Sequence, residues 1–498
     1  MIDFATPLAD WIIILPLVLC LGGAALLMML RSLLQVQMWV CVAVVALVLA
    51  CDAALALRVF NDGPVAMTMG NWLPPFGITF AADMTGAGFA LASAIATLCV
   101  VLYMRSDVPE SALRDGVYPL TLLLLAGVTG SFLTGDLFNL YVWFEVMLIS
   151  SFGLMVLGGR PLQLDATVKY GILNFLGTTL FLLGLGLLFG GLGTLNMADI
   201  IGRAASADPA TLTAVAALFI LAFGIKAAVF PVNAWLPASY HAPPAVISAL
   251  MGGLLTKVGA YALLRTLLML MPAARETLGP VLMVVLVSGA LLGPLSAIAE
   301  TNLRRSIGFI LLGSVSVLLL CVPNGHILPA VGGLSYGFHS ILTFTALYLV
   351  AGLIERATGQ ADTRQMRGLY AANSLLSVLF FVLILAVSGI PPFLGFWPKI
   401  LLLQGFLGQG GDWLGAFAVL LNAFLTLIAG SRLWSHIFWR GTAERASLPL
   451  GAVSAAALLT LVIVALGLAP NLMIAAAQIG GSDMLNPARY ITSVGLAP

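Results

Sequence analysis

Charged residues are scarce in this chain of 498 residues. Only 8% of the residues are Asp, Glu, Lys or Arg and 61% are hydrophobic, whereas about a quarter of a typical soluble domain is charged. The formal net charge is only +1, and the scattered arginines form no basic patch of the kind that binds nucleic acid. This composition excludes a soluble domain of this size, excludes a nucleic-acid partner, and predicts a protein embedded in the lipid bilayer.

The sequence also lacks the short motifs of most enzyme classes. Its five cysteines lie in or beside apolar runs without CxxC spacing, which predicts small core residues rather than disulfides or an iron–sulfur ligand set. There is no P-loop, paired-histidine metal motif, GxSxG motif, or haem or flavin signature. The glycine-rich segment GGLGTLN at 190–196 follows no strand, so we interpret it as a loop. We therefore predict no cofactor and no bound metal ion.

Long apolar runs make up most of the chain. A transmembrane helix needs about 20 mostly apolar residues, and no loop between the runs is long or polar enough to form a soluble domain. We predict an all-α integral membrane protein with a single polytopic domain over residues 1–498. The fourteen runs lie at residues 8–30, 36–60, 79–104, 117–135, 137–157, 166–191, 210–230, 245–270, 278–299, 302–321, 326–354, 371–390, 413–439 and 449–474.

Basic residues are distributed unevenly among the loops. Loops after even-numbered runs carry little beyond Arg58, Arg203 and Arg275. Because cytoplasmic loops are enriched in Lys and Arg, the loops after odd-numbered runs should face the cytoplasm, and both termini should lie outside. Those loops carry Arg31, Arg105, Arg114, Arg160, Arg304, Arg305, Arg356, Arg364, Arg367, Arg440 and Arg445.

Lysine is much rarer than arginine: 17 of the 21 basic residues are Arg. Three of the four lysines, Lys226, Lys257 and Lys399, lie within apolar runs, whereas Lys169 is near a span end. A charge at membrane depth is costly and points to function. Arginine cannot be deprotonated in practice, while a buried lysine can titrate near neutrality. Fixed charges at the edges and titratable charges inside are what a proton pathway requires.

Prolines interrupt two of the runs beside these lysines. FPVNAWLP follows Lys226 in the seventh run, and SGIPPFLGFWPK contains Lys399 in the continuation of the twelfth. Paired interrupted segments in corresponding places indicate a transporter built from internal repeats, with its pathway at the breaks.

The fifth run, GDLFNLYVWFEVMLISSFGLM, carries two carboxylates. Asp136 is near its start, and Glu145 is about two and a half turns further in. If Glu145 faces Lys226, opening and closing one ion pair would change the pKa of the lysine enough to release a proton, since such a pair is worth about 4 kcal/mol at 4 Å. The alternative is a static pair that holds two helices together, which would leave Lys257 and Lys399 unexplained.

Two histidines and one further aspartate complete the candidate residues. His339 lies well inside the eleventh run, and its unperturbed pKa near 6.5 suits a proton relay, although a packing role fits it equally when it is taken alone. His241, at SYHAPP, lies at a span end and could guard an entrance. Asp83, in FAADMTGAG, is a candidate for a cation pathway because hard cations prefer oxygen ligands.

These stretches resemble the antiporter-like membrane subunits shared by Mrp-type multisubunit cation/proton antiporters and respiratory complex I. The resemblance covers nearly the whole chain, and it implies fourteen helices with helices 7 and 12 broken. It also implies that helices 4–8, about 117–270, and helices 9–13, about 278–440, form two inverted five-helix repeats. It rests on GDLFNLYVWFEVMLISSFGLM, FGIKAAVFPVNAWLPASYHAPPAVISALMGGLLTKVGAYALLR, LRRSIGFILLGSVS and SGIPPFLGFWPK.

The resemblance also implies a chain of protonatable residues along the membrane midplane. By this comparison Glu145 is the helix-5 carboxylate, Lys226 its helix-7 partner, Lys257 the bridging lysine, His339 a relay histidine and Lys399 the terminal lysine. The chain departs from the family at two positions. Many members have a lysine where this chain has Phe344, and many read FPLHxWLP where this chain has Asn233. Both departures remove a protonatable group from the centre of the relay.

Within the family, the chain is most similar to the D-type subunits of Mrp antiporters. That similarity implies a secondary transporter rather than an enzyme, in the bacterial cytoplasmic membrane. It implies assembly with other subunits of a hetero-oligomeric complex and exchange of protons for monovalent cations such as Na⁺. The alternative is a proton-pumping membrane subunit of a redox complex, either an NADH:quinone oxidoreductase or a membrane-bound hydrogenase. A scaffold with vestigial charges is disfavoured, because each buried charge is costly.

Overall fold

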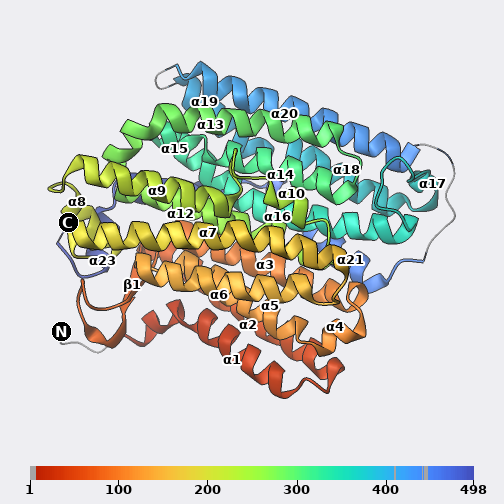
Figure 1. The fold of residues 1–498 in the computed structure, drawn as a ribbon, viewed down its shortest axis with the longest axis horizontal. Coiled ribbons are helices and arrows are strands. Elements are labelled where there is room, and N and C mark those ends of the chain that lie inside the picture. The colour runs from red at the N-terminus through yellow and green to blue at the C-terminus, as the bar shows by residue number, and fades with distance from the viewer. Residues whose placement is uncertain (1–6, 409–410, 440, 442–446, 498) are drawn as a thin grey trace.

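Helices run side by side along the long axis of the molecule in the computed structural model (Figure 1), which describes residues 7–408, 411–439, 441 and 447–497. The predicted cytoplasmic residues Arg440 and Arg445 lie outside the described residues.

Within the described residues, eleven helical segments are long and apolar enough to cross a membrane, and three further apolar helices are shorter. The protein is therefore a mostly helical, multi-pass membrane protein. The shorter helices are α1 (Leu15–Met29), α5 (Val117–Leu133) and α18 (Ser374–Ser388). The long segments are α2 (Leu34–Asp62), α3 (Met84–Asp107), α6 (Leu137–Val156), α7 (Pro161–Leu192), α9 (Pro209–Ala227), α11 to η4 (Ala245–Leu270), α13 (Pro272–Ala299), α14 with α15 (Leu303–Asn324), α16 (Ile327–Thr358), α20 with η5 (Trp413–Trp439) and α21 (Leu450–Leu468).

Short elements connect or subdivide these helices. The segment 245–270 is one continuous helix in which α11 (Ala245–Leu250) and α12 (Thr256–Leu264) alternate with two π-helical stretches, η3 (Met251–Leu255) and η4 (Arg265–Leu270). The other short elements are η1 (Leu8–Ile13), η2 (Met69–Asn71), α4 (Glu110–Arg114), α8 (Met197–Ala204), α10 (Trp235–Ser239), α15 (Cys321–Asn324), α17 (Leu369–Ala372), α19 (Phe396–Gly408), α22 (Asn471–Leu485), α23 (Ala488–Ser493) and η5 (Ser435–Trp439).

The prediction of an all-α chain is wrong in one place. Residues 79–82, expected to begin the third span, form strand β2 (Thr79–Ala82), which pairs antiparallel with β1 (Val65–Thr68). The next residue, Asp83, is extended and its carboxylate accepts a hydrogen bond from the Gly86 amide, so it caps α3 and fixes the start of that helix at Met84. The span is consequently shorter than the apolar run.

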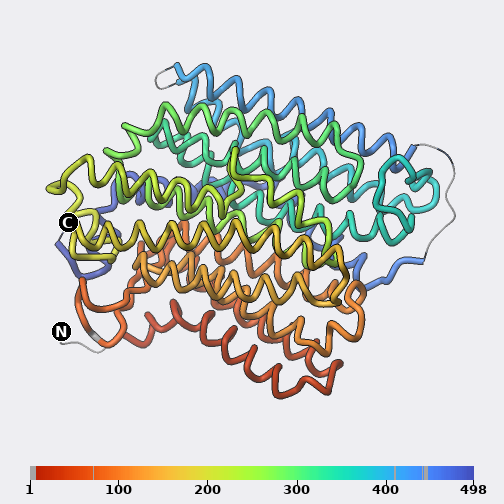
Figure 2. Tube along the Cα trace, in the orientation of Figure 1, coloured from red at the N-terminus to blue at the C-terminus, as the bar shows by residue number. Residues whose placement is uncertain are grey.

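The fourteenth run also differs from its predicted range of 449–474. Helix α21 ends at Leu468, and a separate helix, α22, begins at Asn471 directly after Pro470. A proline has no backbone N–H to continue the ladder of a preceding helix, which accounts for the break. Helix α22 then packs against α16 and α3, and α23 lies beside β1 and α8 at one end of the bundle, next to the C-terminus (Figure 2).

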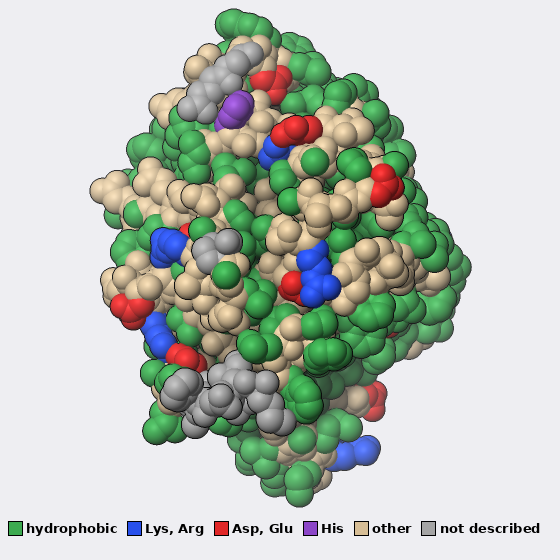
Figure 3. All heavy atoms as spheres, turned by 90° about the vertical axis from the view of Figure 1, so that its left-hand side faces the viewer, with side chains coloured by type: hydrophobic (Ala, Val, Ile, Leu, Met, Phe, Trp, Pro, Cys, Tyr) green, Lys and Arg blue, Asp and Glu red, His purple; other side chains and the backbone are tan. Residues whose placement is uncertain are grey.

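The bundle has two distinct ends, which we name by what they carry. The hairpin end carries β1, α8 and α23, and the opposite end carries α4 and α17 (Figure 1). Of the arginines expected to face the cytoplasm, Arg105, Arg304, Arg305 and Arg356 lie at the opposite end, where α3 and α16 finish and α14 begins. At the hairpin end, seen face-on in Figure 3, charged side chains are few and dispersed. The five cysteines are free thiols, as predicted.

Candidate functional site

The predicted break in the seventh run is present. Helix α9 ends at Ala227, and Ala228 takes up the left-handed conformation with φ of 57° before the short helix α10 begins at Trp235. Two carbonyl groups next to the break are bonded within the protein: the Gly224 carbonyl accepts from the Val229 amide at 2.8 Å, and the Ile225 carbonyl accepts from the Trp235 indole Nε1 at 3.0 Å. Such internal pairing is what permits irregular backbone at membrane depth.

Lys226 lies in the last turn of α9 beside this break and is only 4% exposed. Its Nζ has no hydrogen-bond partner among the described residues and lies 5.8 Å from the centre of the Phe144 ring. Gly259 of α12 packs directly against this part of α9, because a Cβ there would be 2.6 Å from the Ala227 nitrogen. Two helices therefore approach closely around a buried lysine side chain whose Nζ has no hydrogen-bond partner among the described residues.

Glu145, on α6, is half-buried and neighbours the Phe144 ring that faces Lys226. It is the charged residue that acts electrostatically on Lys226. Within the described part of the chain, however, the two side chains form no direct ion pair. The structure thus brings the predicted partners near each other without closing the pair between them.

Lys257 is fully buried in α12, between the two π-helical stretches. Its Nζ donates to the Gly252 carbonyl at 2.7 Å and lies 5.0 Å from the centre of the Phe344 ring. The phenylalanine that replaces the usual family lysine thus faces Lys257 directly. A cation over an aromatic ring is attracted by about 2 kcal/mol when the pair is desolvated, so Phe344 stabilises the charge on Lys257 without carrying a proton itself.

His339 is fully buried in α16, and both Lys257 and Lys399 act on it electrostatically. Its Nδ1 shares a hydrogen bond of 2.9 Å with the Thr343 hydroxyl, whereas its Nε2 has no partner among the residues described. The free edge of the imidazole abuts the second broken segment, since a Cβ on Gly395 would be 2.8 Å from Nε2. Both lysines are therefore close enough to the histidine to act on it, and one of its ring nitrogens is unused.

The second predicted break is also present, between the end of α18 at Ser388 and the start of α19 at Phe396. Lys399 projects from α19 back to the broken end, where its Nζ donates to the carbonyls of Val387 at 3.2 Å and Ser388 at 2.9 Å. A Cβ on Gly389, which has φ of +83°, would be 2.6 Å from the lysine Cδ. Only glycine therefore leaves room for this side chain.

Asp136 lies at the hairpin end rather than among the buried lysines. Its carboxylate caps α6 by accepting a hydrogen bond from the Asn139 amide at 2.8 Å. Burial raises the pKa of this carboxyl from its ordinary value of 3.8 to about 6, against the hydrogen bonds from Asn139 and Phe138, which lower it. Asp136 thus has a structural role as a cap and a charge that titrates close to neutrality.

Asp136→Asn is expected to raise the melting temperature of the protein at pH 8 and to leave it unchanged near pH 4. The stability that the neutral carboxyl contributes is fully present below pH 3.8 and is lost as the pH rises through about 6. Two pKa units correspond to about 3 kcal/mol, and asparagine keeps the helix cap. Thermal unfolding of the purified protein at both pH values measures the effect.

The control for this prediction is Asp208→Asn at the cap of α9. Hydrogen bonds from Thr211 and Ala210 lower the pKa of the exposed Asp208 carboxyl, so its charged form is the stabilising one. This variant should be less stable than the unmodified protein at pH 8, which is the opposite sign. If Asp136→Asn also lowered the melting temperature at pH 8, burial would not dominate at Asp136.

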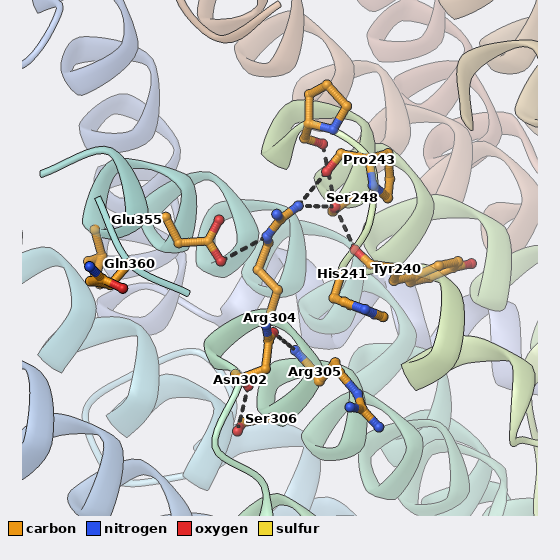
Figure 4. A network of polar contacts seen from close by, with 12 residues as sticks. Tyr240, His241, Pro243, Ser248, Asn302, Arg304, Arg305, Ser306, Glu355 and Gln360 are labelled. Carbon is orange, nitrogen blue, oxygen red and sulfur yellow. Dashed lines mark hydrogen bonds and ion pairs between the residues drawn. The ribbon is translucent and has the colours of Figure 1, made fainter. Parts of the chain in front are cut away.

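His241 lies at the opposite end, next to a polar network (Figure 4). Its Nδ1 is 3.0 Å from the Pro237 carbonyl oxygen, and burial lowers its pKa. Beside it, Arg304 pairs with Glu355 at 3.0 Å, and its guanidinium also donates to the Pro243 carbonyl and to the Ser248 hydroxyl. The network fixes the turn that follows the broken helix, so His241 is at an end of the bundle and not in its centre.

Asp83 is completely buried and pairs with Arg265, a residue that sequence reasoning did not single out. The Asp83 Oδ2 accepts from Arg265 Nη1 at 2.6 Å, and Oδ1 accepts from Nη2 at 2.9 Å. Both carboxylate oxygens are engaged, which favours a structural role over cation binding. The signal that was available is the helical spacing of Lys257, Tyr261 and Arg265, which places three polar side chains on one face.

A helical membrane bundle with two broken helices and buried lysines is typical of a known family of membrane proteins. Residues 134–426 match the family described as NADH:quinone oxidoreductase/Mrp antiporter, TM. The chain belongs to this family.

One named relative and two solved structures show which members of this family the chain is similar to. The chain is 33% identical over 488 residues to the D-type subunit of the Na(+)/H(+) antiporter of Bacillus subtilis (strain 168), across 97% of this chain and 99% of the relative. It is also similar to a chain of the Mrp complex from Dietzia sp. DQ12-45-1b, with a TM-score of 0.92 and 27% identity over 98% and 100% of the two chains. A chain of the membrane-bound sulfane sulfur reductase, an archaeal respiratory membrane complex, superposes with a TM-score of 0.88 and 26% identity over 98% and 99%.

Proposed function

We propose that this chain is the proton-conducting subunit of a multisubunit Na⁺/H⁺ antiporter in the bacterial cytoplasmic membrane. The observation that carries the proposal is Lys226, a buried ammonium without a hydrogen-bond partner among the described residues, beside a broken helix. An unpaired ionisable group at membrane depth is energetically costly, so its presence indicates a functional role. The name of the Bacillus subtilis relative supports the antiporter assignment.

In this proposal protons move along Lys226, Lys257, His339 and Lys399. This order of residues is supported by their electrostatic effects on one another. Lys257 and Lys399 both act on His339, and Glu145 acts on Lys226. Glu145 acts as the switch: when it closes onto Lys226 it holds the proton, and when it withdraws it lets the proton leave. The unused Nε2 of His339 accepts and returns the proton between the two lysines.

The finer architecture belongs to the same proposal. Eleven long and three short apolar helices in the described residues fit fourteen transmembrane segments, arranged as two inverted five-helix repeats that each contain one broken helix. The opposite end, rich in arginine, would face the cytoplasm. Sister subunits of the hetero-oligomer would complete the complex and carry the cation or part of its path.

Vesicles provide the test. Inverted membrane vesicles would be prepared from an antiporter-deficient bacterium that expresses this chain together with its neighbouring genes, and from a matched strain that lacks only this chain. A pH gradient would be imposed and followed with a pH-sensitive dye while Na⁺, K⁺ and Li⁺ are added in turn. Collapse of the gradient on addition of a cation, seen only with the complete set of genes, is the expected result and identifies the ion.

A second candidate function is that of a proton-pumping subunit in a redox complex, and the similarity to the sulfane sulfur reductase chain favours it. The same relay would then be driven by electron transfer in a partner. In that case no cation would collapse the gradient, whereas addition of an electron donor would build one. That pair of results would overturn the antiporter proposal.

A further inference from the structure

A fully buried ion pair lies between the central lysine Lys257 and the surface of the hairpin end. Arg265 is 1% exposed and Asp83 is not exposed at all. The pair is bidentate, and Asp83 at the same time caps α3 through the Gly86 amide at 2.8 Å. The proton relay proposed above does not use either residue, although a buried ion pair is costly to form unless its geometry is nearly ideal.

The pair continues a polar face that begins at Lys257. Tyr261 and Arg265 follow Lys257 at intervals of four residues along α12 and the start of η4, so the three side chains lie on one face of the helix. The Tyr261 hydroxyl accepts from Arg265 Nη2 at 2.6 Å and donates to the Phe132 carbonyl at 2.9 Å. The helix widens into π-helical geometry at Arg265, a feature that is frequent at functional sites.

Residues from the end of the chain lie on the outer side of the pair. The Tyr490 ring of α23 is 5.4 Å from the Arg265 guanidinium carbon, and the Tyr261 ring is 5.1 Å from it, so aromatic rings pack on the cation from two elements. Asp483 of α22 is 3% exposed, and its Oδ2 has no hydrogen-bond partner among the described residues. Its Oδ1 is 3.6 Å from the half-exposed Arg489, which leads to the surface.

Polar side chains therefore lead inward from the surface through Arg489, Asp483 and the Arg265–Asp83 pair to Tyr261. Lys257 is the next polar residue on the same face of the helix, with its Nζ bonded to the Gly252 carbonyl. We propose that the Arg265–Asp83 pair is a seal in this line, which keeps water and protons from passing between the hairpin-end surface and Lys257. The inference rests on the proposed function only in treating Lys257 as a residue that carries protons.

The physical basis of the seal is the mutual satisfaction of the two charges. An arginine does not release its proton, so the closed pair cannot pass one along. While the pair is closed, Nη1 and Nη2 of Arg265 donate to the two carboxylate oxygens and Nη2 also donates to the Tyr261 hydroxyl, whereas Nε has no partner among the described residues. If the carboxylate is neutralised, the buried guanidinium must recruit water to replace it. That water would lie against the Tyr261 hydroxyl, one helical turn from Lys257.

The alternative is that the pair only fastens α3 to η4. Asp83→Asn separates the two readings, because asparagine is close in size and keeps the helix cap but leaves Arg265 without a charged partner. The companion variant Asp83→Asn with Arg265→Met removes both charges, so that no unpaired ion is left to recruit water. Asp165→Asn is the matched control, since Asp165 pairs with Lys169 at an exposed site.

The experiment measures passive proton entry into proteoliposomes that contain the purified, assembled complex, with no Na⁺ present. The expected result is a several-fold faster entry with Asp83→Asn, and entry at the rate of the unmodified complex with both the charge-free double variant and Asp165→Asn. Equal rates in all four proteins, and also in the variant that combines Asp83→Asn with Asp483→Asn, would overturn the seal. A leak that persisted in the double variant would also overturn it, because the unpaired charge would not be its cause.

Two further provisions keep the test decisive. If Asp483 pairs with Arg265 when Asp83 is neutralised and so hides the leak, adding Asp483→Asn to Asp83→Asn removes that substitute and should expose it. The leak assay does not depend on coupled transport. A complex that exchanges no cation but leaks with Asp83→Asn would contradict the antiporter function and still support the seal.

Discussion

Lys226→Ala is expected to abolish cation-driven proton transport while the complex still assembles. The Nζ of Lys226 is buried without a partner among the described residues, so its removal takes away a proton station but no structural hydrogen bond. Loss of a positioned proton-transfer group costs roughly a hundredfold or more in rate. Dye-monitored exchange in inverted vesicles measures the loss, and Lys169→Ala is the control, because Lys169 is exposed and pairs only with Asp165 among the residues that the structure describes.

Glu145→Ala extends this prediction to the proposed switch. The side chain is half-buried and makes no ion pair with Lys226 in the described structure, so alanine should not unfold α6. Transport should nevertheless fall as far as in Lys226→Ala, and the double variant should be no worse than either single one. Normal exchange in either single variant would exclude an opening and closing pair as the switch.

Lys399→Arg is expected to fail almost as completely as a deletion of the side chain. The Lys399 ammonium donates to the Val387 and Ser388 carbonyls at the broken end of α18. Arginine can keep the charge and can donate to those carbonyls, but it cannot release a proton in the physiological range. Vesicle exchange with the assembled complex should therefore fall roughly a hundredfold or more.

A second variant controls for the possibility that Lys399→Arg is inactive only because arginine is too large to fit beside Gly389. Lys399→Gln is smaller, keeps a donor for the broken helix end and also lacks a titratable proton, so it should fail in the same assay. Full activity of the arginine variant would mean that only a fixed charge is needed at this position. Activity of the glutamine variant would mean that hydrogen bonding alone is sufficient there.

The sequence predicts those parts of the site that depend on local pattern. Proline-interrupted runs placed both helix breaks correctly, beside Lys226 and Lys399, because a proline inside a helix removes a backbone donor. Proline alone does not decide the matter, since α13 continues through Pro280 and Pro294. The scarcity of lysine pointed to three residues that the structure buries. The apolar runs likewise located the membrane spans. The two exceptions are the start of α3, which β2 delays, and the end of α21, which precedes Pro470.

Contacts between distant segments could not be predicted. Asp83 and Arg265 are 182 residues apart in the chain, and no local pattern shows that one neutralises the other, so Asp83 looked available to a cation. Similarly, the sequence shows that Phe344 replaces a lysine but not that its ring faces Lys257. The roles proposed for Glu145, Lys226, Lys257, His339 and Lys399 remain predictions until the variants are tested.

If protons move as proposed, the position of Phe344 limits how much positive charge the proposed relay stores at one time. With a phenylalanine there, the line from α9 to α19 has four sites that can hold a proton, namely Lys226, Lys257, His339 and Lys399. Removing a fifth cation from beside Lys257 lowers the repulsion among those that remain, and like charges in a medium of low dielectric repel strongly. In the proposed relay, the central lysine would therefore be loaded more easily, and fewer charges would move in each cycle.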